Sequence, residues 1–150
     1  MDAQDWQARR RTWFVIFGGM ATSVVLYRVL LAAVGSGPVP PTASVLRAAF
    51  YVAAASSLLA SIAWTRSRLE PPAGDPGEPP PREPQPPIPQ FMTASVVAMA
   101  LAEGSSVLGF VLVCCGAGSP AEYLAFGAGT FLVLALVILP RGLRYWSGFS

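Results

Sequence analysis

Residues 91–115 read FMTASVVAMALAEGSSVLGFVLVCC, and Glu103 is the one charged side chain in this run of 25 residues. A helix needs about 20 mostly apolar residues to cross the hydrocarbon core of a bilayer. The run lacks the alternation of apolar and polar residues that a membrane-spanning strand shows. The sequence therefore predicts a transmembrane helix with a single carboxyl group near its middle.

Three other segments have the same apolar character and are interrupted by very few charges. They are residues 13–34 (with Arg28), 45–65 (with Arg47 near the start) and 121–139 (with Glu122 at the edge). Over the whole chain 53% of residues are hydrophobic, 12% are charged and the mean hydropathy is +0.52, whereas soluble domains carry about 25% charged residues. We predict an all-α fold, an integral membrane four-helix bundle that forms a single membrane domain over residues 1–150.

Local motifs predict where these helices begin and end. Gly35–Pro38 should end the first helix, and Pro140-Arg141-Gly142 should end the last. Ser119-Pro120-Ala121-Glu122 has the pattern of a capping box, with Ser119 as the N-cap and Pro120 at the first helical position. The fourth helix is therefore expected to start at this motif.

Residues 66–90 should form a proline-rich loop between the second and third helices. Ten of the nineteen residues in Pro71–Pro89 are proline, which favours an extended polyproline-like connector. The same composition would also suit a partner that recognises proline-rich segments.

The arginines predict how the chain is oriented in the membrane. Eight of the ten fall in the N-terminal tail, in the 66–90 loop or in the C-terminal tail: Arg9, Arg10, Arg11, Arg66, Arg68, Arg82, Arg141 and Arg144. Cytoplasmic segments of membrane proteins carry the excess of basic residues, so both termini and this loop should be cytoplasmic. Arg-only basic composition favours a bacterial inner membrane. The first span is too long for the apolar part of a cleaved signal peptide, so we expect it to be retained.

Aromatic side chains near the ends of the spans are expected to form interfacial belts. This set comprises Trp6, Trp13, Trp64, Tyr145 and Trp146 at the inner interface and Tyr123 at the outer one. Helices in lipid associate through small residues that let their backbones approach, and each span has such a stripe. The stripes are Gly18-x-x-x-Thr22 and Gly19-x-x-x-Ser23; Ala49, Ala53, Ser57 and Ser61; Ser95, Ala98, Ala102, Ser105 and Gly109; and Ala121, Ala125 and Gly129.

The ionisable residues exclude much chemistry. The chain has no His and no Lys, and so lacks the commonest general base and metal ligand as well as any Schiff-base lysine. Cys114 and Cys115 cannot form a zinc site by themselves, and are expected to be small apolar packing residues. A net charge of +2 does not suggest a nucleic-acid partner. We therefore expect no enzymatic activity, no metal and no cofactor, with the lipid bilayer and other membrane helices or a homo-oligomer as partners.

Glu103 is the residue most informative about function, because a carboxyl group near mid-membrane is costly and is a functional hypothesis by default. It can stay protonated, because burial disfavours the charged form, or it can pair with a cation. Arg28 is offset from it by roughly 7 Å along the bilayer normal, so an Arg28–Glu103 ion pair is one prediction. Arg47 and Glu122 are predicted to form a second pair, at the outer interface.

The segment Ser95–Phe110 resembles the carboxylate helix of the proteolipid subunit of rotary ATP synthases. That helix has an Ala-Leu-x-Glu core, small residues after it and a glycine-containing apolar continuation. The resemblance implies that Glu103 is a proton- or sodium-binding carboxylate, with the hydroxyls of Ser105 and Ser106 nearby as ion-binding candidates.

The likeness covers residues 45–115. The second span is rich in Ala and Ser and runs toward a loop that contains Arg82-Glu83-Pro84-Gln85-Pro86, where the family has an Arg-Gln-Pro loop. In this chain Arg82 and Gln85 are not adjacent, and two further helices flank the hairpin. The favoured function is therefore a non-enzymatic structural or accessory subunit of a membrane complex. The alternative is a proteolipid-like proton- or cation-binding protein that uses Glu103, and an inert paired Glu103 or a site for another ligand also stays open.

Overall fold

The computed structural model describes residues 3–34, 43–69 and 86–148, and nearly all of these residues are helical. The helices are α1 (Ala3–Val34), α2 (Ser44–Leu69), α3 (Ile88–Cys114) and α4 (Pro120–Leu132), which continues through the π-helical turn η2 (Val133–Ile138) into α5 (Leu139–Ser147). These make four long apolar helices, each of which is long and apolar enough to cross a membrane. The predicted fold class is confirmed. Residues 70–85, the main part of the predicted proline-rich loop, lie outside the described residues.

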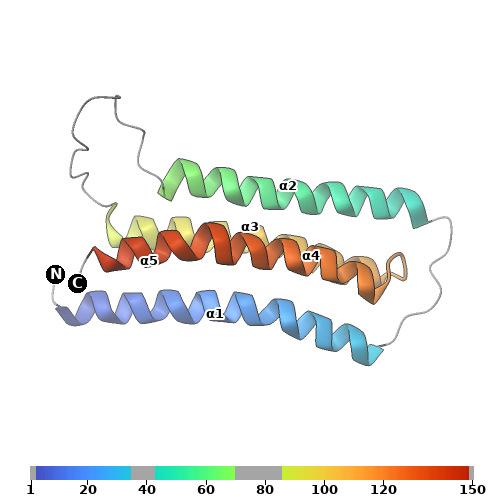
Figure 1. Ribbon diagram of the computed structural model, residues 1–150, viewed down its shortest axis with the longest axis horizontal. Helices are drawn as coiled ribbons and strands as arrows, with labels where there is room; N and C mark the ends of the chain where they lie inside the picture. The colour runs from blue at the N-terminus through green and yellow to red at the C-terminus, as the bar shows by residue number, and fades with distance from the viewer. Residues whose placement is uncertain (1–2, 35–42, 70–85, 149–150) are drawn as a thin grey trace.

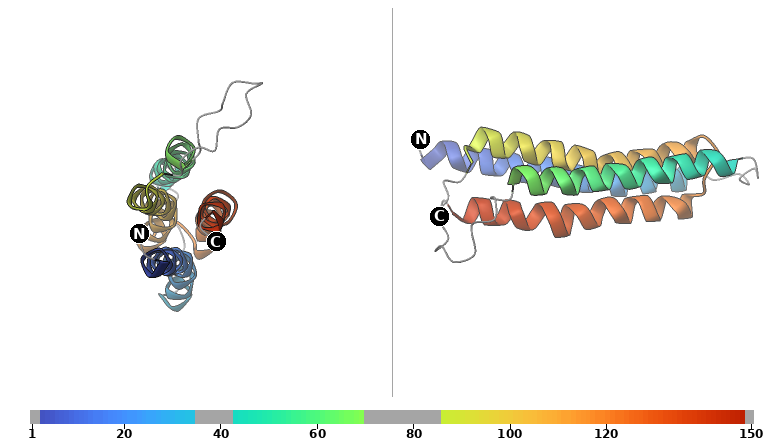
Figure 2. Two further views of the ribbon diagram at one scale, coloured as in Figure 1. Left: turned by 90° about the vertical axis from the view of Figure 1, so that its left-hand side faces the viewer. Right: turned by 90° about the horizontal axis from the view of Figure 1, so that it is seen from above.

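The four long helices lie side by side in one bundle (Figures 1 and 2). Seen end-on, α1 and α2 lie at opposite edges, and α3 and the continuous α4–η2–α5 helix lie between them. The first turn of α1 and the last turn of α5 are at the same end of the bundle (Figure 1). We call this the arginine-rich end, because it carries all seven described arginines other than Arg28 and Arg47.

Helix α3 is the centre of the bundle because its side chains are small where other helices cross it. The predicted stripe of Ser95, Ala98, Ala102, Ser105 and Gly109 is buried along its whole length, which confirms that prediction. Backbone carbonyls of α3 are thereby brought within reach of side chains from its neighbours.

Three side chains of helix α2 donate hydrogen bonds to backbone carbonyls of α3, and these bonds form a ladder between the two helices. Ser57 donates to the carbonyl of Leu101, Ser61 donates to that of Ala98 at 2.7 Å, and the Trp64 indole donates to that of Ala94 at 3.1 Å. Each carbonyl accepts this bond in addition to its helical one, and such bonds hold helices together where no water competes.

The other small-residue stripes have mixed outcomes. Thr22, Ala49 and Ala53 are exposed, and only Ser57 and Ser61 of the predicted α2 stripe contact α3. On α4 the predicted stripe is wrong for Ala121 and Ala125, which are exposed, whereas Gly129 lies against Leu58 of α2. The buried residues of α4 are Tyr123, Phe126, Gly127 and Thr130. The buried α4 face contains two aromatic residues because the small side chains of α3 leave room opposite them.

The last helix does not end at Pro140-Arg141-Gly142, contrary to the prediction. Proline in a helix lacks the N–H that would bond four residues back, and its ring crowds that carbonyl. Here the preceding turn is π-helical, and the N–H of Leu139 bonds to the carbonyl of Leu134, five residues back. The wider turn gives Pro140 room at the start of α5, and the helix continues to Ser147.

Several aromatic residues expected at the level of the membrane interfaces are buried between the helices. Trp13 and Trp146 are 0% and 1% exposed and pack with Phe91 and Tyr145 at the arginine-rich end. Gly142 makes this possible, because a Cβ on it would lie 2.2 Å from the Trp13 ring. Tyr123 is also buried, and its hydroxyl donates to the carbonyl of Val24 at 2.8 Å.

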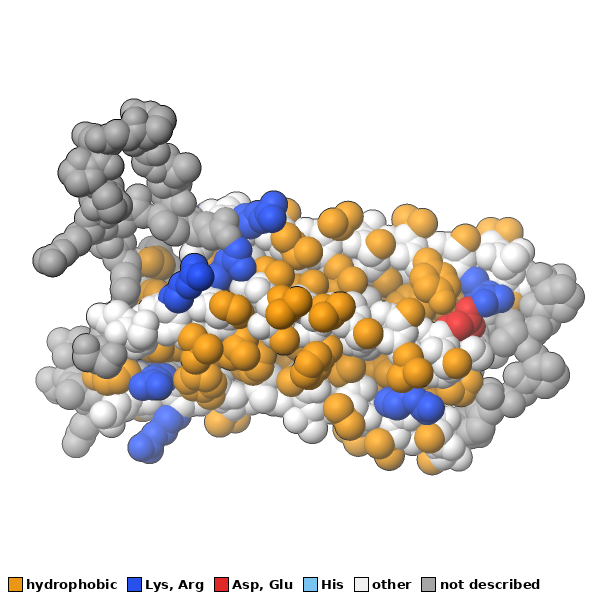
Figure 3. All heavy atoms as spheres, viewed as in Figure 1, with side chains coloured by type: hydrophobic (Ala, Val, Ile, Leu, Met, Phe, Trp, Pro, Cys, Tyr) orange, Lys and Arg blue, Asp and Glu red, His pale blue; other side chains and the backbone are white. Residues whose placement is uncertain are grey.

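The side of the bundle is covered by apolar side chains, and arginines gather toward the arginine-rich end (Figure 3). Exposed large apolar residues lie on every long helix, among them Val15, Val52, Val111 and Leu136. This surface suits hydrocarbon rather than water, as the four apolar spans predict.

Candidate functional site

Glu103 lies in the middle of α3, half-buried, on the side that meets α1. Its Oε1 is 2.5 Å from the Oγ of Ser23 on α1. The same Ser23 Oγ is 2.7 Å from the carbonyl oxygen of Met20, one turn earlier in the helix. The carboxyl group is therefore joined to the backbone of α1 through one serine hydroxyl.

The two contacts of Ser23 limit which protonation states satisfy them. A hydroxyl has one hydrogen to donate and two lone pairs to accept with. If Glu103 is ionised, Ser23 can donate either to the carboxylate or to Met20, but not to both. If Glu103 is protonated, it donates to Ser23, and Ser23 donates to the Met20 carbonyl. Only the protonated form satisfies both contacts at once.

Tyr27 completes the immediate surroundings of the carboxyl group. It follows Ser23 by four residues and so lies on the same face of α1. Its hydroxyl is close enough to interact with the Glu103 side chain. The sequence alone did not predict Ser23 or Tyr27 as partners of Glu103. Their two hydroxyls lie four residues apart on one face of α1, and this spacing could have indicated them.

Arg28, the predicted partner of Glu103, is half-buried on α1, and no ion pair joins the two among the residues that the structure describes. Arg28 is one residue beyond Tyr27 and so points about 100° away from the face that meets Glu103. The depth of Arg28 suited the pair, but the rotation of α1 turns another face toward α3.

No hydrogen bond joins Ser105 or Ser106 to Glu103 among the described residues. Ser106 donates to Thr130 of α4 at 2.8 Å, and Thr130 Oγ1 lies 2.9 Å from the carbonyl oxygen of Ala102. Ser105 is 1% exposed, and its hydroxyl has no hydrogen-bond partner within the described helices. Ser106 instead serves the packing of α3 against α4.

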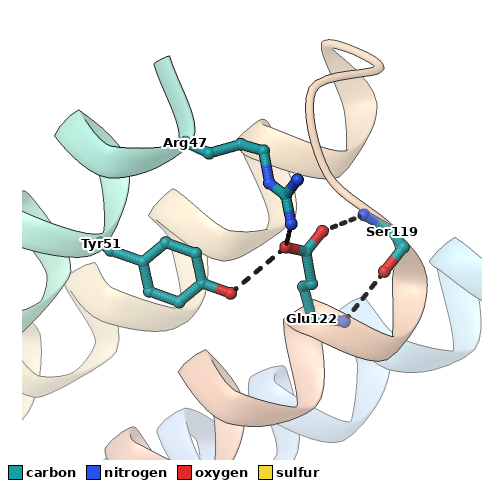
Figure 4. A network of polar contacts seen from close by, with 4 residues as sticks. All are labelled: Arg47, Tyr51, Ser119 and Glu122. Atoms are coloured by element: carbon teal, nitrogen blue, oxygen red, sulfur yellow. Dashed lines mark hydrogen bonds and ion pairs between the residues drawn. The ribbon is translucent and has the colours of Figure 1, made fainter. Parts of the chain in front are cut away.

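The structure does bring Arg47 and Glu122 together (Figure 4). They lie at the end of the bundle opposite the arginine-rich end. Arg47 of α2 and Glu122 of α4 form an ion pair, and the hydroxyl of Tyr51 lies 3.4 Å from the same carboxylate oxygen. The second oxygen accepts from the backbone N–H of Ser119 at 2.7 Å, while Ser119 Oγ accepts from the N–H of Glu122. The predicted capping box is confirmed.

This arrangement is structural in character. The Arg47 and Glu122 side chains are 41% and 17% exposed, and a pair this open to its surroundings contributes about 0–1 kcal/mol. Its main effect is to fix the start of α4 against α2. Of the two predicted ion pairs, the Arg47–Glu122 pair forms and joins α2 to α4. The Glu103 site holds a carboxyl group that can gain or lose a proton.

The described residues contain no group of three or more Cys, Asp and Glu side chains that could hold a metal ion. Cys114 and Cys115 are both free and exposed at the end of α3. Comparison of the chain with protein-family models, with curated proteins and with solved structures gives no match.

Proposed function

We propose that this chain is a non-enzymatic accessory or structural subunit of a membrane complex, with both termini in the cytoplasm of a bacterial cell and with other membrane helices as partners. The observation that carries the proposal is a small-residue face on α1 that no described part of the chain covers. A Cβ built on Gly18 or Gly19 meets no atom within 4 Å.

The surroundings of these glycines support the proposal. Thr22 is exposed one turn further on, and Val15 and Val25 on the same side are 73% and 59% exposed. Lipid tails are as apolar as valine, so apolarity alone does not favour a protein partner over lipid. A glycine face does, because it lets the backbone of another helix approach closely. Glycine inside a helix is otherwise unfavourable by about 1 kcal/mol relative to alanine.

Substitution of Gly18 by Ile tests this role. The new side chain enters open space in the monomer, so the bundle should fold as before, but it would hold a second helix away. We expect the complex to migrate as a smaller species on native gels of mildly solubilised membranes. Val15→Ile, which adds bulk to the same face without removing a glycine, should leave migration unchanged. Equal migration of wild type and Gly18→Ile would contradict the proposal.

A second function, reversible binding of a proton or cation at Glu103, is favoured by the 2.5 Å contact with Ser23. The likeness to the proteolipid hairpin supports it as well. Carbodiimide labels protonated carboxyl groups, so labelling of Glu103 should fall as the pH rises, and Glu103→Gln provides the background. Protection by sodium at constant pH would identify a cation site, and pH dependence alone would identify a proton site. Labelling that is independent of both would argue against this function.

A further inference from the structure

A cleft of about 590 Å³ lies at the arginine-rich end, between the last turns of α2 and the first turns of α3. Trp64, Ser67 and Arg68 line it from α2, and Gln90 and Thr93 are among the residues that line it from α3. It is separate from the Glu103 site, which lies where α3 meets α1. The interhelical contacts described above do not account for a cleft with an arginine at this place.

The guanidinium group of Arg68 lies at the wall of the cleft. The Trp64 indole is fixed by its hydrogen bond to the carbonyl of Ala94. The guanidinium carbon of Arg68 lies 5.2 Å from the centroid of that indole ring, within the range of a cation–π contact. Arg68 is exposed and forms no ion pair with any acid of the described segments. Its N–H groups therefore remain available to an anion.

The surrounding charge is also positive. Arg66 and Arg144 both lie close enough to Arg141 to repel it, so arginines of α2 and α5 gather at the same end of the bundle as the cleft. Asp5 is the one acidic residue among those described at this end, and the first turn of α3 has no acidic residue. The charges described at this end thus favour a negatively charged ligand.

We propose that this cleft binds the phosphate head group of an anionic phospholipid. Arg68 and the side-chain amide of Gln90 supply donors to the phosphate oxygens. Proline and alanine side chains of α3 form an apolar wall that suits the glycerol and the upper acyl chain of a lipid. A free phosphate ion has no apolar part that could contact this wall. Tryptophan is typical of the membrane interface, and basic pockets between membrane helices on the cytoplasmic side bind such head groups.

The test is native mass spectrometry of the full chain released from nanodiscs that contain equal amounts of phosphatidylcholine and phosphatidylglycerol. Wild type should retain phosphatidylglycerol preferentially. Arg68→Gln should lower that preference about fivefold, since one basic residue at the membrane surface contributes on the order of 1 kcal/mol. Arg10→Gln is the matched control. Arg10 also lies over a tryptophan, Trp6, at the same end of the bundle but lines no part of the cleft.

Two further arms separate the cleft from general surface charge and from free phosphate. Thr93→Leu fills the cleft without changing any charge and should also lower retention, with helicity checked by circular dichroism. Inorganic phosphate at millimolar concentration should not displace the bound lipid. Undiminished retention in Arg68→Gln and Thr93→Leu would overturn the proposal, as would equal loss in Arg10→Gln. Displacement by inorganic phosphate would show an ion site instead of a lipid site.

Discussion

At the scale of single residues, the carboxyl group of Glu103 interacts with hydroxyls of α1 and forms no ion pair among the described residues. The sequence predicted that Glu103 lies near the middle of its helix, as it does in α3, and a count of helical rise made Arg28 the candidate partner. The count carries no information on how α1 is rotated about its axis. That rotation places Ser23 and Tyr27 beside the carboxyl group and turns Arg28 aside.

Removing the hydroxyl of Ser23 tests this description of the site. Ser23→Ala leaves the carboxyl group without its 2.5 Å partner, so we expect faster carbodiimide labelling of Glu103 and a loss of about 0.6 kcal/mol of unfolding free energy. Arg28→Leu should change neither quantity. The opposite ranking of the two variants would restore the Arg28–Glu103 ion pair.

Glycine positions differ sharply in what a larger side chain would meet. A Cβ on Gly109 would lie 2.6 Å from Phe126, whereas Gly18 has open space. Overpacking of a close contact typically costs about 1–3 kcal/mol, so Gly109→Ala should lower the unfolding free energy by this amount. Gly18→Ala adds the same methyl group in open space, so it should not lower the unfolding free energy and should raise it by up to about 1 kcal/mol, because alanine favours the helix over glycine. Denaturation in mixed micelles followed by circular dichroism measures both, and equal stability of the two variants would contradict the α3–α4 packing.

At the scale of elements, the sequence predicted the four spans and the buried stripe of α3, because length and the spacing of small residues determine both. It did not predict the whole face of α2 that meets α3, since Ser57 and Ser61 of the predicted stripe contact α3 whereas Ala49 and Ala53 are exposed. Ser56 and Ser57 are adjacent and chemically identical, and only Ser57 contacts α3. Nor did it predict that α4 continues past Pro140, because a single proline does not reveal whether the preceding turn is π-helical.

The hydrogen-bond ladder between α2 and α3 is testable with a matched control. Ser57→Ala and Ser61→Ala together remove two side-chain donors to α3 carbonyls, and bonds of this kind in membranes average about 0.6 kcal/mol each. We therefore expect a loss of about 1 kcal/mol in the double variant and no loss in Ser56→Ala. An unaffected double variant would mean that close packing alone holds α2 to α3.

At the scale of the whole molecule, one chain builds a bundle whose centre is α3 and whose outer faces are apolar. Glu103, the Arg47–Glu122 ion pair and the cationic cleft lie at three different levels along this bundle. The composition already indicated a membrane protein, since charge this sparse cannot cover a water-facing surface. The candidate sites needed the structure, because they depend on contacts between helices that are far apart in sequence.

We infer that the polypeptide crosses the bilayer four times, with the arginine-rich end on one side and the end of α3 on the other. The two native cysteines make a direct measurement possible, because Cys114 and Cys115 are exposed at the end opposite the arginines. A membrane-impermeant maleimide should label them from the face of sealed vesicles opposite to that on which a C-terminal tag is digested by protease. Labelling of the cysteines and digestion of the tag from the same face would contradict the account.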